Sequence, residues 1–178
     1  MKPKLIGFDL DGTIWTPDMY MLYGGAPFTV AGDGTKQLKD SRGDTVELLG
    51  ISGTILHDLN YHEAWEGVRV AWVSKCDEPE WADECLRKFR STGVDPKPLE
   101  KLAHTSHIYK GNKKDHFRRI QKEFPQLQFE DMVFYDNQMD NIRAVEGLGV
   151  ACYYCPQGMT EKIWLDSLEH YAQRMSKK

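Results

Sequence analysis

Two aspartates, Asp9 and Asp11, follow a short apolar run near the start of the chain, in the segment LIGFDLDGTIW. In extended chain, residues two apart point to the same side, so both carboxylates can face one site. Carboxylates gathered at the end of a buried strand repel each other and lose hydration unless a cation lies among them. Mg²⁺ suits such oxygen ligands, and a carboxylate beside it can attack a phosphoryl group. The pair therefore suggests magnesium-assisted phosphoryl transfer.

Further polar side chains follow later apolar runs. Ser74 ends VRVAWVS, Lys113 comes after SHIYKGN, and Asp136 ends DMVFYD. Thr13 lies two residues beyond Asp11. Hydroxyl and ammonium groups are donors suited to phosphoryl oxygens, and a helix start adds further donor field. Ligands in parallel α/β sheets bind beyond the carboxyl ends of the strands, so we expect these groups to meet at one rim.

Three of these assignments have competing interpretations. Lys110, Lys113 and Lys114 lie close together, and a lysine run is usually a solvated face. Asn112 can cap the following helix, which favours Lys113 in its first turn. Serine after a strand, as at Ser74, is also commonly a helix cap. Asp140, four residues after Asp136, could support the site or simply complement the helix dipole.

The elements that must position these residues alternate along the chain. Apolar runs predict strands at 4–8, 68–76, 131–136 and 150–154, and a short strand followed by a turn within 106–112. Helical spacing predicts helices at 52–67, 78–93 with its stop at Gly93, 113–124, 138–149 and 160–175. Alternation of this kind predicts an α/β fold with a doubly wound, roughly five-stranded parallel sheet.

Residues 16–49 break the alternation. They are rich in Gly, Asp and Ser, with turn pairs at Asp33-Gly34 and Gly43-Asp44. We expect short strands or hairpins that form a small lid over or beside the site. A length of 178 residues predicts one domain, residues 1–178, with the 16–49 excursion as part of it.

Composition excludes several classes of protein. With 23 Lys and Arg against 27 Asp and Glu, the formal charge is -4, which gives no general attraction to nucleic acid or anionic membrane. We find no apolar run of about 20 residues, and the apolar start is interrupted by acids, which argues against a secretory signal. We therefore expect a cytoplasmic protein. The CYYC pair, Cys152 and Cys155, lies in a predicted strand where residues three apart face opposite sides, which favours incidental cysteines.

The aromatic residues after the two aspartates allow two interpretations. Trp15, Tyr20 and Tyr23 could be core residues, or they could form an aromatic wall for a flat leaving group. The six histidines have no partner acid or third ligand fixed by spacing, so we interpret all six as structural or exposed.

The segment FDLDGT resembles the first motif, DxDGT, of the haloacid dehalogenase-like (HAD) superfamily. The serine of VAWVSK, the lysine of YKGNKKDHF and the acids of VFYDNQMD fall in the order of its other motifs. Longer segments, among them PFTVAGDGT, DSRGDTVEL, MVFYDNQMDNI and LGVACYYCPQGM, are similar to the eukaryotic magnesium-dependent phosphatase branch. The resemblance implies a Rossmann-like HAD fold with a minimal hairpin lid and no large cap domain.

The resemblance also implies roles. Asp9 would be the nucleophile, and Asp11 would protonate the leaving group and then activate water. Mg²⁺ would rest on the Asp9 carboxylate, the main-chain carbonyl of Asp11, and Asp136. The phosphoryl oxygens would be held by Thr13, Ser74 and Lys113.

The sequence departs from that branch at two positions of the motifs. Residue 12 is Gly where Tyr is expected. Asn137 follows Asp136 where a second acid is often found. Either Asp140 replaces that acid or metal affinity differs, and Asn137 and Asp140 are both candidates for a supporting role around the metal.

These features predict Mg²⁺-dependent phosphomonoester hydrolysis through an aspartyl-phosphate. The resemblance links this activity to aryl or tyrosine phosphates and to sugar phosphates on glycated amines. One alternative is a dehalogenase or phosphonate hydrolase on the same fold, although a dehalogenase needs neither the acid Asp11 nor a metal. The other is a Mg²⁺- or phosphate-binding module without turnover. The sequence leaves the oligomeric state open.

Overall fold

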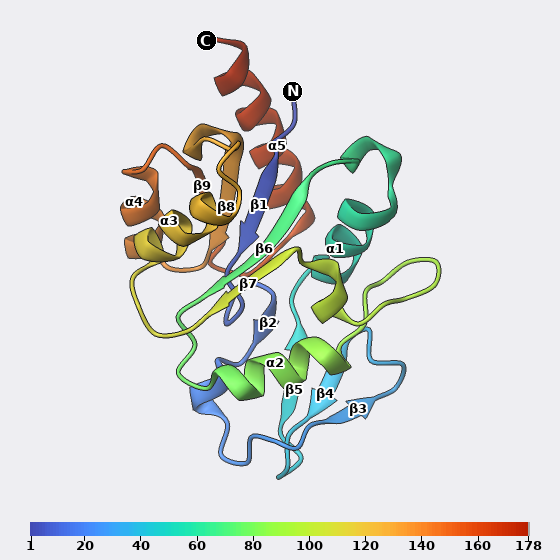
Figure 1. Ribbon diagram of the computed structural model, residues 1–178. Helices are drawn as coiled ribbons and strands as arrows, with labels where there is room; N and C mark the ends of the chain where they lie inside the picture. The colour runs from blue at the N-terminus through green and yellow to red at the C-terminus, as the bar shows by residue number, and fades with distance from the viewer. Residues whose placement is uncertain (178) are drawn as a thin grey trace.

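A five-stranded parallel sheet forms the centre of the computed structural model, which describes residues 1–177 (Figure 1). The strand order is β7-β6-β1-β8-β9, and all four pairings are parallel. The bounds are β1 Leu5–Phe8, β6 Arg69–Ser74, β7 Thr105–Ile108, β8 Met132–Asp136 and β9 Ala151–Tyr154. The predicted doubly wound sheet of five strands is therefore confirmed.

Side-chain alternation along each strand divides the core into two clusters. In β1, Ile6 and Phe8 join the cluster on one face of the sheet, whereas Leu5 joins the cluster on the other. Gly7 faces the second cluster, where an added Cβ would lie 3.1 Å from the Phe117 ring. Both faces of the sheet are thus covered, as the near-continuous apolar runs of the strands require.

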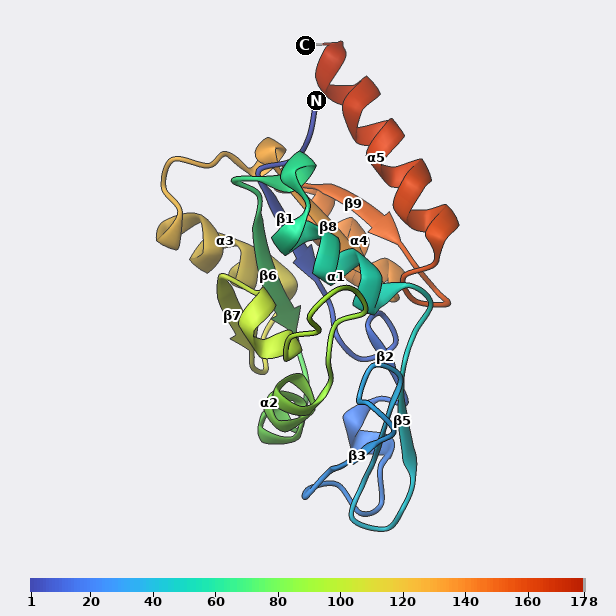
Figure 2. The same cartoon turned by 90° about the vertical axis from the view of Figure 1, so that its right-hand side faces the viewer.

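Helices cover both faces of the sheet (Figure 2). Helices α3 (Lys113–Glu123) and α4 (Met139–Glu146) pack on the Leu5 face. Residues of α1 (Ser52–Tyr61), α2 (Pro79–Lys88) and α5 (Glu161–Ser176) belong to the cluster on the Phe8 face. In residues 1–177, no helix combines the length and the apolar character needed to cross a membrane.

The 16–49 excursion forms most of a second, antiparallel sheet of order β2-β5-β4-β3. Its strands are β2 Trp15–Thr16, β3 Thr29–Ala31, β4 Gln37–Lys39 and β5 Thr45–Leu48. It is tied to α2, because Glu84 Oε1 accepts from Phe28 N at 2.8 Å and Lys88 donates to the Phe28 carbonyl. Within residues 1–177 this small sheet is the only addition to the central fold, so no large cap domain is present.

Three predicted helices are shorter than expected, and the one predicted at 138–149 is α4, which ends at Glu146. The helix predicted at 52–67 ends at Tyr61 and is followed by a short 3₁₀ helix, η2 (Glu63–Trp65). The helix predicted at 78–93 ends at Lys88, because Phe89 turns into extended backbone and is fully buried. Gly93, the predicted stop, instead lies against His57, where an added Cβ would be 2.2 Å from the imidazole ring.

Candidate active site

The carboxyl ends of β1 and β8 bring Asp9 and Asp136 to the same amine. Lys113 Nζ lies 2.7 Å from Asp9 Oδ1 and 3.1 Å from Asp136 Oδ2. The exposed fractions of Lys113, Asp9 and Asp136 are 1%, 7% and 0%. Because buried charges are tolerated only when they are paired, this triad is a single electrostatic unit with a net charge of -1 when all three groups are ionised.

The cap of α3 explains why Lys113 is the lysine that reaches the site. The Asn112 side chain accepts from Asp115 N at 2.9 Å, so the helix begins at Lys113, as predicted. Lys113 Nζ also donates to the Val73 carbonyl at 2.5 Å. Lys110 is exposed and pairs instead with Asp77, at 3.5 Å.

Asp136 has protein donors on both oxygens. Oδ1 accepts from Gln138 N at 2.7 Å, and Oδ2 accepts from Asn141 Nδ2 at 3.0 Å in addition to Lys113. Asn141 is a residue that sequence reasoning missed, although it belongs to the buried face of α4. Asp140, its neighbour, is exposed. The spacing of the buried positions along α4 was the signal that could have favoured Asn141 over the acid.

Asn137 faces the oxygens expected to hold a metal. The end of its amide lies 3.2 Å from Asp9 Oδ2 and 3.0 Å from the Asp11 carbonyl oxygen, and its NH₂ can donate to both. With a cation present, the amide can turn its own oxygen toward the same point. Octahedral ligands at 2.0–2.1 Å from Mg²⁺ lie about 3 Å apart, so the three positions fit this ion.

This oxygen set differs from a typical cluster of charged ligands. Residues 1–177 contain no group of three His, Cys, Asp or Glu side chains placed to hold a metal. The oxygens gathered at Asn137 come instead from one carboxylate, one main-chain carbonyl and one amide. All three are hard oxygen donors, which favours Mg²⁺ over softer ions.

Asp11 is held by the chain that follows it. Its Oδ1 accepts from Trp15 Nε1 at 2.8 Å and from Met19 N at 3.3 Å. Burial raises the pKa of Asp11 to about 6, although the Trp15 hydrogen bond opposes the rise. Burial also raises the pKa of Asp9, and Lys113 opposes that shift. A carboxyl with a pKa near 6 can both give and take a proton near neutral pH.

The two predicted hydroxyls differ in their access to the site. Thr13 is fully buried beside Asp9, with its Oγ1 3.4 Å from Asp9 Oδ2. Ser74 lies at the end of β6 and accepts from Cys76 N at 3.2 Å. A hollow of about 180 Å³ is lined by Asp9, Asp11, Ser74 and Lys113, together with Asp18, Tyr20, Lys75, Cys76, Asp77, Gln138 and Asn141.

The aromatic residues after Asp11 divide between the two interpretations. Trp15 is fully buried and stacks on Phe89, with ring centroids 6.0 Å apart. Tyr20 lines the hollow, whereas Tyr23 is 84% exposed. No histidine of residues 1–177 lines this hollow. Only Tyr20 is therefore placed to meet a leaving group.

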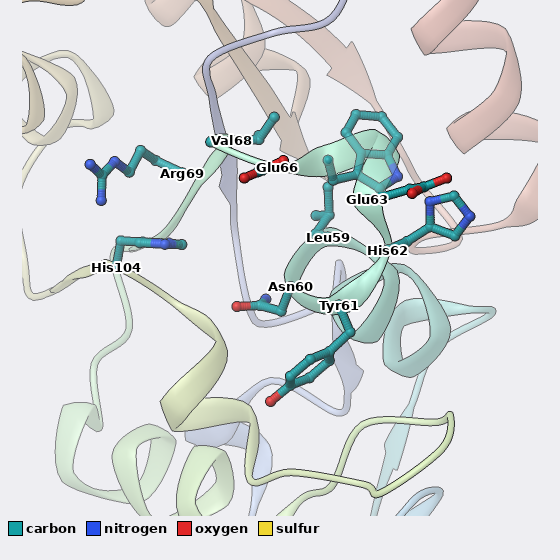
Figure 3. A pocket seen from close by; sticks show the side chains of 11 residues that line it. Leu59, Asn60, Tyr61, His62, Glu63, Glu66, Val68, Arg69 and His104 are labelled. Atoms are coloured by element: carbon teal, nitrogen blue, oxygen red, sulfur yellow. The ribbon is translucent and has the colours of Figure 1, made fainter.

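A second hollow, of about 380 Å³, lies at the opposite, amino ends of β6 and β7 (Figure 3). Arg69 is the first residue of β6, His104 directly precedes β7, and Tyr61 and His62 lie at the end of α1. All four of these residues are exposed. The hollow has no counterpart to the buried triad of Lys113, so its chemistry is that of an ordinary surface.

Comparisons with known proteins show what this chain is similar to. A family model described as Acid Phosphatase matches residues 1–174. Magnesium-dependent phosphatase 1 of Homo sapiens is 33% identical over 171 residues, covering 96% of this chain and 88% of the human protein. A HAD-like hydrolase superfamily protein of Schizosaccharomyces pombe is 29% identical over 150 residues, covering 83% of each chain.

Solved structures share the fold at lower identity. A phosphatase domain of Bacteroides fragilis, complexed with Mg, superposes with a TM-score of 0.59 at 22% identity. That match covers 94% of this chain but only 40% of the longer bacterial chain. CbbY from Rhodobacter sphaeroides, in complex with phosphate, gives a TM-score of 0.57 at 15% identity over 89% of this chain and 88% of its own.

Proposed function

This chain belongs to the Acid Phosphatase family and has the HAD-like fold, and from that premise we propose that Asp9 forms a covalent aspartyl-phosphate during Mg²⁺-dependent hydrolysis of phosphomonoesters. The coarser activity, that of a phosphatase, follows from the family. The observation that carries the finer proposal is the buried contact of 2.7 Å between Asp9 and Lys113, in a hollow that also contains Asp11.

In the first step, an Asp9 oxygen attacks phosphorus as the bond to the leaving-group oxygen breaks. Asp11 gives its proton to that oxygen, so the leaving group departs as a neutral alcohol or phenol. In the second step, Asp11 takes a proton from water, which attacks phosphorus and releases inorganic phosphate. Asp9 is restored as a carboxylate, and Asp11 is again protonated.

The metal would be held by the Asp9 carboxylate, the Asp11 carbonyl oxygen and the Asn137 amide oxygen. When bound, Mg²⁺ supplies positive charge that offsets the phosphoryl oxygens and the acids around them. We assign to Asn137 the metal-ligand position that the family resemblance implied for Asp136, because both Asp136 oxygens already accept from protein donors. Asp136 then orients Lys113.

We propose that Lys113 and Ser74 bind the phosphoryl oxygens, and their position in the lining of the hollow beside Asp9 supports this role. Thr13 lies behind Asp9 and supports its carboxylate. Charge on Lys113 would offset the negative charge that develops on phosphorus in the transition state.

The substrate class we propose is aryl or tyrosine phosphates, or sugar phosphates on glycated amines. The hollow is small, about 180 Å³, and no large cap covers it, so a leaving group would project past Tyr20 toward solvent. Tyr20 is 59% exposed and can stack on a flat group.

The test is hydrolysis of p-nitrophenyl phosphate by the purified protein, with Mg²⁺ and with chelator, for wild type and Asp9→Asn. Activity that needs both Mg²⁺ and Asp9 supports the proposal, and trapping of phosphorylated Asp9 completes it. Turnover that survives Asp9→Asn would rule out the covalent route. Saturable binding of phosphate without turnover of any phosphomonoester would favour a binding module.

A further inference from the structure

One oxygen of Asp11 has two N–H donors, and one of them comes from a buried indole. Trp15 Nε1 donates to Oδ1 at 2.8 Å, and Met19 N donates to the same atom at 3.3 Å. Within residues 1–177, no N–H group donates to Oδ2; the Cys76 thiol also interacts with this carboxyl. The two carboxyl oxygens are therefore not equivalent.

The indole that makes this contact is held rigidly. Trp15 is fully buried, stacks on Phe89 and pairs with Leu48 between β2 and β5. Its carbonyl accepts from Gly12 N at 2.8 Å, which closes the loop that carries Asp11. Movement of the indole would disturb the small sheet, so the position of Asp11 Oδ1 is fixed by the fold.

A second buried tryptophan shows that burial does not require such a contact. Trp72, in β6, is 1% exposed, and its Nε1 has no hydrogen-bond partner in the described part of the chain. The two indoles thus differ in one respect that bears on chemistry: the N–H of Trp15 meets a carboxyl in the site, and that of Trp72 meets none.

The two donors determine which oxygen of a protonated Asp11 carries the hydrogen. An oxygen that accepts two N–H groups is the carbonyl oxygen of the acid, because a hydroxyl oxygen is the poorer acceptor. A proton on Asp11 would therefore be carried by Oδ2, the oxygen without an N–H donor. Asp11 lines the hollow beside Asp9, where the leaving group of a substrate would lie.

We propose that Trp15 is a positioning residue for proton transfer, which holds Asp11 so that the proton on Oδ2 faces the leaving group. This inference rests on the proposed function of the site. As the phosphorus–oxygen bond breaks, the Oδ2–H bond breaks and its proton joins the leaving oxygen. Asp11 is left as a carboxylate, whose negative charge both N–H donors then stabilise.

The test compares two leaving groups. Phenol needs a proton as it departs, whereas dinitrophenolate does not, so only the first substrate depends on correct placement of the acid. In the Mg²⁺-loaded enzyme, Trp15→Phe should lower kcat/KM for phenyl phosphate by about tenfold more than for dinitrophenyl phosphate. Trp72→Phe, the matched control, should change both substrates by the same factor.

A second variant keeps the test valid if Trp15→Phe does not fold. Replacement of Trp15 by benzothienylalanine, in which sulfur takes the place of the indole N–H, preserves the shape of the side chain and removes only the donor. It should reproduce the leaving-group dependence.

If either Trp15 variant lowered kcat/KM by the same factor for both substrates, the proposal would be overturned and Trp15 would be a structural residue. The proposed function fails in a different way, because wild type would then hydrolyse neither ester. If wild type acts on both esters and the variants keep its ratio of rates, the phosphatase mechanism stands and only the role of Trp15 falls.

Discussion

Two buried carboxylates, Asp40 in the small sheet and Asp9 at the rim of the central sheet, lie in opposite environments. Asp40 is 4% exposed and occupies the turn between β4 and β5. Its oxygens accept, at 2.8–3.1 Å, from the main-chain N–H groups of Gly24, Gly25, Arg42 and Asp44. Burial alone would raise the pKa of Asp40, but these four donors hold it below its usual range.

Asp9 has a similarly small exposed fraction but lies deeper in the protein, and its pKa shifts in the opposite direction. Burial raises its pKa, Lys113 opposes the rise, and Asp136 and Asp11 reinforce it. The fold satisfies the charge of Asp40 with its own groups and leaves that of Asp9 short of positive charge. A carboxylate of the first kind stabilises a turn, whereas one of the second kind is suited to bind a cation or to react.

The substitution Asp9→Asn should show the difference between Asp9 and Asp40 most clearly. We expect activity on aryl phosphates to fall at least about a thousandfold, because an amide cannot act as the nucleophile. In metal-free protein, stability should rise. A carboxyl with a raised folded-state pKa destabilises the fold increasingly as pH climbs from its unfolded value, near 4, toward the folded value. Urea melts at pH 5 and pH 8 measure this.

The increase in stability of metal-free Asp9→Asn over wild type should be larger at pH 8 than at pH 5. A loss of stability in Asp9→Asn at both pH values would mean that Asp9, like Asp40, serves mainly to hold the fold.

Lys113→Met tests the cation that both site acids share. Removal leaves Asp9 and Asp136 buried without their partner, so the free energy of unfolding should fall by about 3–5 kcal/mol, and activity should fall at least about a hundredfold. Lys110→Met is the matched control. Its exposed pair with Asp77 should contribute less than about 1 kcal/mol. Equal effects of the two variants would contradict the assignment of Lys113.

Asp40→Asn should give the reverse of Asp9→Asn. One oxygen becomes an NH₂ facing N–H donors, so we expect a loss of about 2 kcal/mol in stability, with kcat/KM within threefold of wild type. A lowered folded-state pKa stabilises the protein above the unfolded pKa near 4, and the contribution disappears as pH falls through the folded value. In urea melts, the difference in stability between Asp40→Asn and wild type should therefore be smaller at pH 3 than at pH 7.

The control for this prediction is Asp33→Asn, at an exposed turn where Asp33 accepts from Thr35. It should leave both stability and activity nearly unchanged. A large loss of activity in Asp40→Asn would mean that the small sheet shapes the site as well as the fold.

The sequence predicted the central sheet because its signal is local. Each apolar run is followed by a turn or a helix start, and Asn112 marks the start of α3 within one residue. Because the ends of the strands could be located from local signals, the polar residues that follow them could also be predicted to lie at one edge of the sheet. The parallel topology then brings Asp9, Ser74 and Lys113 together without further information.

The errors have tertiary causes. Helix α2 ends at Lys88 because Phe89 is needed in the core, which no local pattern reveals. The amides Asn137 and Asn141 were undervalued because their contribution depends on which side of the β8–α4 connection faces Asp9. The hydrogen bond from Trp15 to Asp11 requires the exact return of the chain into β2, so spacing alone could not predict it.

Asn137→Asp makes the smallest change and tests the metal site itself. An acid at this position would add a negative charge 3.2 Å from Asp9 Oδ2 and 3.0 Å from the Asp11 carbonyl oxygen. Mg²⁺ affinity rises with the charge of its ligands, so calorimetric titration should show Mg²⁺ binding about tenfold tighter than in wild type.

The same variant should be less stable than wild type without metal, because two carboxylates would then face each other. Asp140→Asn, at an exposed position in the first turn of α4, is the matched control and should leave Mg²⁺ affinity unchanged. If Asp140→Asn weakened Mg²⁺ binding and Asn137→Asp did not strengthen it, Asp140 would supply the acid that Asn137 lacks. Mg²⁺ affinity would then depend on the charge of a residue in α4 and not on that of a residue at the end of β8. The proposed role of Asn137 as a ligand predicts the opposite result: Mg²⁺ affinity depends on the charge of residue 137, at the end of β8, and Asn137→Asp raises it.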